Sequence, residues 1–145
     1  MSTLQQDVYT IHQLSAQLVY IKWHKNPPIC NEFQNDFLSK LKALLDQAEG
    51  KLFFVSDLRA GRIHDAKFIR KLALLLTNHP QYGGSTSFAM DTISRTLVSV
   101  FTLTSRRGYQ TEIHPNAESA FDYIESLCPS ILHGVNWQAV VDGEA

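Results

Sequence analysis

The residues whose types could do chemistry are concentrated in one polar stretch, positions 57–67. Its charged and titratable members are Asp57, Arg59, Arg62, His64, Asp65 and Lys67. An aspartate near a histidine can act as an acid–base pair, and an arginine can bind a phosphate or carboxylate through two parallel hydrogen bonds. The stretch therefore predicts either a hydrolytic site that uses Asp57 and His64, or a surface that binds a protein or a small anionic ligand. A plainer reading stays open, in which the aspartates cap helices and the arginines face solvent.

Other familiar chemistries find no motif. The six histidines do not follow the HxH, HxxxH or HExxH spacing of metal ligands, and the two cysteines, Cys30 and Cys128, form no CxxC pair. There is no GxSxG nucleophile motif and no glycine-rich phosphate loop. We therefore predict no metal site and no cofactor.

Composition narrows the class of protein. The chain has 145 residues and a formal net charge of −1, which predicts a single globular domain and argues against a nucleic-acid partner. The N-terminus lacks the basic and apolar regions of a signal peptide. The longest apolar run, Leu72 to Leu76, is far too short to span a membrane. These features predict a cytoplasmic protein with no integral membrane segment.

The elements that must position the polar stretch follow from hydrophobic periodicity. Two β-rich runs, Val8–Leu14 and Leu18–Trp23, predict an antiparallel hairpin. Three strands are then expected, at 52–55, 85–90 and 109–113. Four helices are expected, at 32–48 capped by Asn31, 66–77 capped by Asp65, 91–104 capped by Asp91, and 117–127 capped by Asn116.

This order, ββαβαβαβα, predicts a mixed, mostly parallel sheet of about five strands with an N-terminal hairpin and four helices. Ligands of such sheets bind beyond the carboxyl ends of the strands. Asp91 and Arg95 would then lie beside the 57–67 stretch and complete the site. Residues 1–129 are expected to form the domain, and 130–145 a tail that packs on the core or on a partner, with Trp137 as its anchor.

With the element order in place, the residues around Asp57 resemble a known family. The run Leu52-Phe53-Phe54-Val55-Ser56-Asp57-Leu58, followed by a second aspartate at Asp65, is similar to the central strand and loop of STAS domains, the SpoIIAA-like antagonists of anti-sigma factors. The run 116–124 is similar to their last helix. The branch grouped with Sec14-like lipid-binding domains looks closer than the phosphoswitch members.

The chain departs from that family at one informative position. In the phosphoswitch members a phosphorylatable serine follows the second aspartate, whereas here Ala66 and Lys67 follow Asp65. The resemblance therefore implies a non-catalytic regulatory module that binds a protein partner or small ligand but lacks the usual switch. Any phosphorylation would fall to Ser56 or to the run Ser85-Thr86-Ser87.

Two other functions remain as alternatives. The first is a carrier of lipids or small apolar ligands, which needs a cavity between the helices and the sheet. The second is the hydrolytic enzyme that uses Asp57 and His64. A homodimer is also expected, because the hairpin would leave an exposed sheet edge and the tail is apolar.

Overall fold

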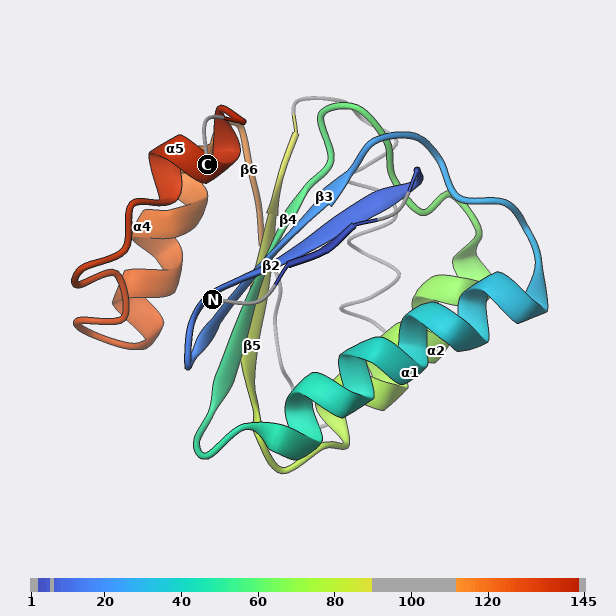
Figure 1. The fold of residues 1–145 in the computed structure, drawn as a ribbon, viewed down its shortest axis with the longest axis horizontal. Coiled ribbons are helices and arrows are strands. Elements are labelled where there is room, and N and C mark those ends of the chain that lie inside the picture. Colours follow the sequence, from blue (N-terminus) through green and yellow to red (C-terminus); the bar gives the residue numbers. More distant parts are fainter. Residues whose placement is uncertain (1–2, 6, 90–111, 144–145) are drawn as a thin grey trace.

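The computed structural model describes residues 3–5, 7–89 and 112–143, and within these ranges the chain forms one six-stranded sheet with helices on both faces (Figure 1). The strands are β1 (Thr3–Gln5), β2 (Tyr9–Ser15), β3 (Leu18–Trp23), β4 (Leu52–Asp57), β5 (Tyr82–Phe88) and β6 (Glu112–His114). The helices are α1 (Asn31–Gln47), α2 (Ala66–Thr77), α4 (Ala117–Leu127) and α5 (Trp137–Val141). The helix expected at 91–104 lies outside the described residues, and so do the predicted site residues Asp91 and Arg95.

The strands pair in the order of the sequence, β1-β2-β3-β4-β5-β6. β1, β2 and β3 are antiparallel neighbours, and β3 through β6 are parallel. The predicted mixed sheet with an N-terminal hairpin is confirmed. β1 is an addition, because a strand of three residues carries too short a pattern to be recognised. It pairs with Thr10, Ile11 and His12 of β2 and so covers part of the hairpin edge.

Strand β4 lies inside the sheet, and both of its faces are buried. Leu52 and Phe54 belong to the core that α1 and α2 cover, whereas Phe53 and Val55 belong to the core under α4 and α5. The two helix layers are visible on opposite sides of the sheet in Figure 1. A continuous apolar run is what a strand needs when neither face meets water, so this run fixes β4 at the centre.

Some element boundaries agree with their predictions and others differ. α2 begins and ends as predicted, with Asp65 as its cap, and Asn116 caps α4 through the Ser119 amide. α1, however, begins one residue early: Cys30 occupies the cap position, and the predicted cap Asn31 is the first helical residue. β4 continues through Ser56 to Asp57, because these residues keep pairing with both neighbouring strands.

The final segment forms a short helix. Trp137 opens α5, and its ring stacks on Phe121 of α4 with centroids 4.5 Å apart. Ile131 and Val141 are buried in the same core. The tail therefore packs on the core of its own chain, and Trp137 is half-buried in that contact. Among the helices described, none is long and apolar enough to cross a membrane.

Gly83 and Gly84 were expected to precede a strand, but both lie within β5. A Cβ atom on Gly83 would come within 2.6 Å of the Phe53 ring, which is itself buried in the core. We therefore expect Gly83→Ala to lower the free energy of unfolding by about 1–3 kcal/mol through overpacking. Urea denaturation measures this loss.

Gly50→Ala is the matched control, because a Cβ atom on Gly50 would meet nothing within 4 Å. The control should unfold at nearly the wild-type urea concentration. Equal stability of the two variants would show that the Phe53 ring moves aside without cost, contrary to this account of β5.

Candidate functional site: the loop after strand β4

Asp57 ends β4, and its carboxylate is the buried centre of the predicted site. Its side chain is only 1% exposed, yet three groups stabilise its charge. Tyr20 of β3 donates its hydroxyl to Oδ2 at 2.6 Å. Arg59 donates Nε to Oδ1 at 2.9 Å and Nη2 to Oδ2 at 2.7 Å, and its backbone amide also donates to Oδ1. A buried charge is tolerated when it is paired and hydrogen-bonded in this way.

The protonation of this cluster follows from its hydrogen bonds. Burial opposes the ionisation of Asp57, but the hydrogen bonds from Arg59 and Tyr20 outweigh it and hold the pKa of Asp57 below its ordinary value. Burial raises the pKa of the Tyr20 hydroxyl far above its usual range, and the neighbouring carboxylate adds to that rise. Near neutral pH the cluster therefore holds a carboxylate, a neutral phenol and a guanidinium.

Arg59 links the cluster to strand β5 and to helix α5. Its guanidinium lies over the Phe88 ring, 5.3 Å from the centroid, at the end of β5. The same Nη2 reaches the carbonyl oxygen of Val141 in α5 at 3.3 Å. Half of the side chain is still exposed to solvent. The guanidinium that was a candidate anion clamp is thus occupied by a carboxylate of its own chain.

The loop that follows, residues 58–65, is packed against the loop between β3 and α1. The Arg62 amide donates to the Asn26 side chain at 3.0 Å. Gly61 lies so close to the Lys25 backbone that an added Cβ atom would stand 2.3 Å from its carbonyl carbon. Only glycine fits at such an approach, so the path of this loop is fixed by its neighbour.

Asp65 closes the loop and fixes the start of α2. Oδ1 accepts the Lys67 amide at 3.0 Å, which caps the helix, and Oδ2 accepts the buried Gln34 side chain of α1 at 3.0 Å. Lys71 donates to the other end of the same amide. The predicted cap is confirmed, and the contact with Gln34 places the first turns of α1 and α2 side by side.

The structure divides the predicted site residues that it describes by the contacts of their side chains. Asp57, Arg59 and Asp65 bind groups of their own chain, although half of the Arg59 side chain is exposed. Arg62 is half-buried. His64 and Lys67 are exposed, and neither side chain has a hydrogen-bond partner in the described part of the chain. No hydrogen bond joins Asp57 to His64 there, so the predicted acid–base pair is not assembled.

Sequence reasoning missed two features of this end of the sheet. Tyr20 was assigned to a strand face, but nothing in its spacing connects it with an aspartate 37 residues away. Ile29, in the loop beside Gly61, is 72% exposed. Its position directly after two prolines was the available signal, because the residues there were already expected to break regular structure.

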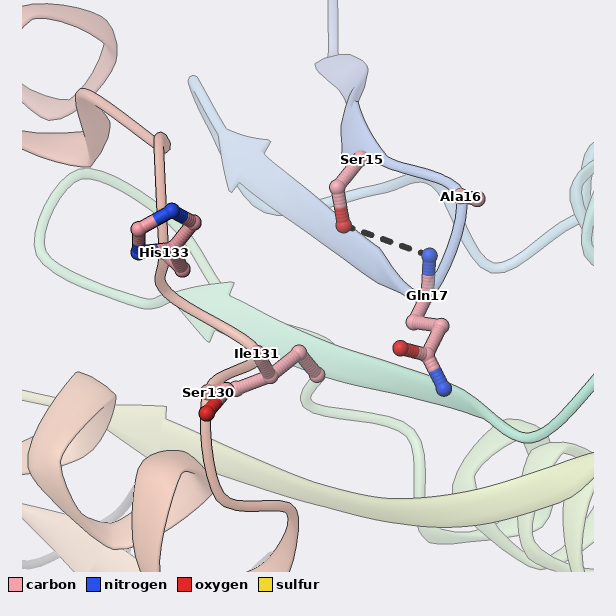
Figure 2. A pocket seen from close by; sticks show the side chains of 6 residues that line it. All are labelled: Ser15, Ala16, Gln17, Ser130, Ile131 and His133. Carbon is pink, nitrogen blue, oxygen red and sulfur yellow. Dashed lines mark hydrogen bonds between the residues drawn. The ribbon is translucent and has the colours of Figure 1, made fainter.

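A pocket lies at the opposite end of the sheet, where the β2–β3 turn meets the segment after α4 (Figure 2). Its volume is about 480 Å³, and its lining residues are Ser15, Ala16, Gln17, Ser130, Ile131 and His133. Glu125 shapes this wall by accepting the backbone amides of Ser130 and Leu132. None of the predicted site residues lines it. No group of three or more histidine, cysteine or acidic side chains in the described ranges could hold a metal ion.

Replacing Asp57 tests the buried cluster. Asp57→Asn removes the charge that binds Arg59, and we expect a loss of about 1–3 kcal/mol of unfolding free energy at pH 7. The low folded-state pKa contributes its full stability above the ordinary aspartate pKa of about 3.9. That contribution disappears as pH falls through the folded-state pKa, so the gap between wild type and Asp57→Asn should shrink below about pH 4.

Urea denaturation from pH 7 down to pH 2.5 measures this gap. Asp122→Asn serves as control, because Asp122 is exposed on α4 and makes no hydrogen bond or ion pair with any residue that the structure describes. A gap of the same size at every pH would mean that Asp57 is not held as a stabilised carboxylate.

Comparison with known proteins bears on the fold. No known family model and no curated protein sequence matches the chain. The solved structure of the anti-sigma factor antagonist SpoIIAA in its unphosphorylated form aligns with a TM-score of 0.56 at 10% sequence identity. The alignment covers 81% of this chain and 96% of that chain. This confirms the resemblance predicted from the strand that ends in Asp57, and the chain has the SpoIIAA-like fold of STAS domains.

Proposed function

We propose that this chain is a non-catalytic regulatory module that recognises a protein partner through the loop after β4 and the first turn of α2. The fold supports this proposal, because it is the fold of a protein that antagonises an anti-sigma factor. The observation that carries it is that some side chains of residues 57–67 bind groups of their own chain, whereas others are exposed. The aspartates and Arg59 hold the loop, which leaves His64 and Lys67 exposed on a fixed backbone.

A fixed loop favours recognition of a partner. Loops that bind are commonly presented by a rigid scaffold, and a surface that is already ordered loses less conformational entropy when it binds. The contacts of Gly61 and Asn26 supply that order on one side, and the cap at Asp65 supplies it on the other.

The recognition surface carries no phosphorylatable serine after Asp65. Ala66 and Lys67 follow it, so the first turn of α2 has a permanent cation where a phosphoswitch would gain negative charge. Of the other candidate residues, Ser85 and Thr86 are buried, whereas Ser56 and Ser87 are half-buried.

The two alternative functions gain no comparable support. A hydrolase needs Asp57 available to substrate, but its carboxylate is buried and bound by Tyr20 and Arg59. A lipid carrier needs space between the helices and the sheet, and in the described part of that region large aromatic side chains pack against one another. The rings of Tyr9, Trp23, Phe37 and Phe68 form one such series of contacts.

Partner capture tests the proposal. The tagged full chain and a His64→Asp/Lys67→Glu double variant are used to capture proteins from lysate of the source cells, and the captured proteins are compared by quantitative mass spectrometry. We expect one or a few proteins to be retained by wild type and reduced at least about tenfold by the double variant. Both changed side chains are exposed, so the thermal melt should be nearly unaltered.

Lys51→Glu is the control for charge reversal elsewhere, since Lys51 is also exposed but precedes β4 at the other end of the strand. Its ammonium donates to the Pro80 carbonyl oxygen at 2.7 Å, so the thermal melt of this variant is measured as well. Arg59 is unsuitable as a test position, because replacing it with an acidic residue would place a second carboxylate beside that of Asp57. Undiminished capture by the folded double variant would remove this loop from the recognition surface.

A further inference from the structure

An apolar side chain stands exposed beside the recognition loop. Ile29 is 72% exposed, in the loop that packs against Gly61 and Arg62. It precedes α1 by two residues, and α1 is joined to the start of α2 by the bond between Gln34 and Asp65. Ile29 thus belongs to the same end of the molecule as His64 and Lys67. We call residues 24–30 and 58–67 together the two-loop surface.

Basic residues predominate in the first turns of α2, at the same end of the molecule as Ile29. α2 carries Lys67, Arg70 and Lys71 within its first six residues and has no acidic residue along its whole length. A cation in the first turn of a helix is disfavoured by the helix dipole, by about 0.3–1 kcal/mol. Helix stability therefore gives no reason for Lys67 to be where it is, whereas an anionic partner would.

The carboxylates nearby offset only part of this charge. Asp57 is paired with Arg59, whereas Asp65 keeps its negative charge, because its partners, the Lys67 amide and the Gln34 side chain, are uncharged. Glu32, in the first turn of α1, is the exposed acidic residue closest in sequence to Ile29. Exposed Lys25 lies within the two-loop surface and adds to the positive side of the balance.

We propose that the two-loop surface binds an acidic protein segment whose apolar side chain packs on Ile29 while its carboxylates face Lys67 and the neighbouring cations. This inference rests on the proposed function and specifies the chemistry of the partner. The apolar contact supplies burial that is insensitive to salt. The charges supply orientation and a salt-dependent rate of association.

A protein segment fits this surface better than a membrane or a nucleic acid. Binding to anionic lipid requires a cluster of roughly four to eight basic residues with little opposing charge, and nucleic-acid binders show a comparable basic stripe. Here the chain as a whole carries a net charge of −1. A few cations at the same end of the molecule as one exposed apolar side chain suit a short acidic stretch of a folded or extended partner.

Peptide selection on the immobilised full chain tests this inference without knowledge of the partner. A random twelve-residue display library is panned at low salt, and the enriched peptides are synthesised and measured by fluorescence anisotropy. The peptides should contain at least two Asp or Glu residues within four positions of a large apolar residue. Their affinity should fall about tenfold or more with Ile29→Ser or with Lys67→Glu, and should weaken as NaCl is raised.

Two control variants match the test positions. Leu74→Ser changes another exposed aliphatic side chain, on α2. Lys51→Glu changes an exposed lysine at the other end of β4. Neither should alter peptide affinity by more than about twofold. Enriched peptides that lack acidic residues, an affinity insensitive to Ile29→Ser, or recovery of no acidic–apolar peptide would overturn the inference. So would phosphatidylserine vesicles that bind more tightly than the peptides.

These outcomes are distinct from failure of the proposed function. If lysate capture depends on His64 and Lys67 while the selected peptides are not acidic, the recognition loop stands and its assigned partner chemistry is wrong. If neither the capture nor the peptides respond to these residues, both are wrong.

Discussion

The carboxylate of Asp57 is the interaction on which the rest of this end of the structure depends. Burying a charge at the end of a central strand costs free energy unless the charge is paired or hydrogen-bonded, and here the chain itself supplies the partners. Tyr20 reaches it from β3, Arg59 reaches it from the loop, and Arg59 in turn holds the last turn of α5. One buried charge thereby connects the sheet, the loop after β4 and helix α5.

The electrostatics of the loop follow from this arrangement. Because Asp57 uses Arg59 and Asp65 uses backbone and amide donors, the acidic groups of residues 57–67 are satisfied internally. Lys67 is exposed, and its side chain has no hydrogen-bond or ion-pair partner among the described residues.

The sequence supported most of the fold and part of the site. The apolar run 52–55 and the periodic stripes of α1, α2 and α4 predict the elements correctly, because burial on both faces or on one stripe leaves a local pattern. Asp65 and Asn116 were predictable as caps, because aspartate and asparagine directly before a helical pattern commonly accept its first free amides. The contacts of Arg59 were not predictable, because they depend on Tyr20, Phe88 and Val141, which only the tertiary fold brings together.

The boundaries were missed where pairing or packing overrides local preference. β4 continues into polar Ser56 and Asp57 because β3 and β5 pair with those positions, and two glycines lie inside β5 because the Phe53 ring fills the space that a side chain would take. Exposure of Ile29 has a similar origin, since the loop that carries it is held by Gly61 and Asn26 and not by its own side chain.

A double-mutant cycle between Asp57 and Arg59 tests the central claim most directly. The unfolding free energies of wild type, Asp57→Asn, Arg59→Gln and the double variant give the coupling between the two side chains. We predict a coupling of about 1–3 kcal/mol at pH 7. Additive effects, with a coupling near zero, would contradict the claim that this ion pair organises the loop.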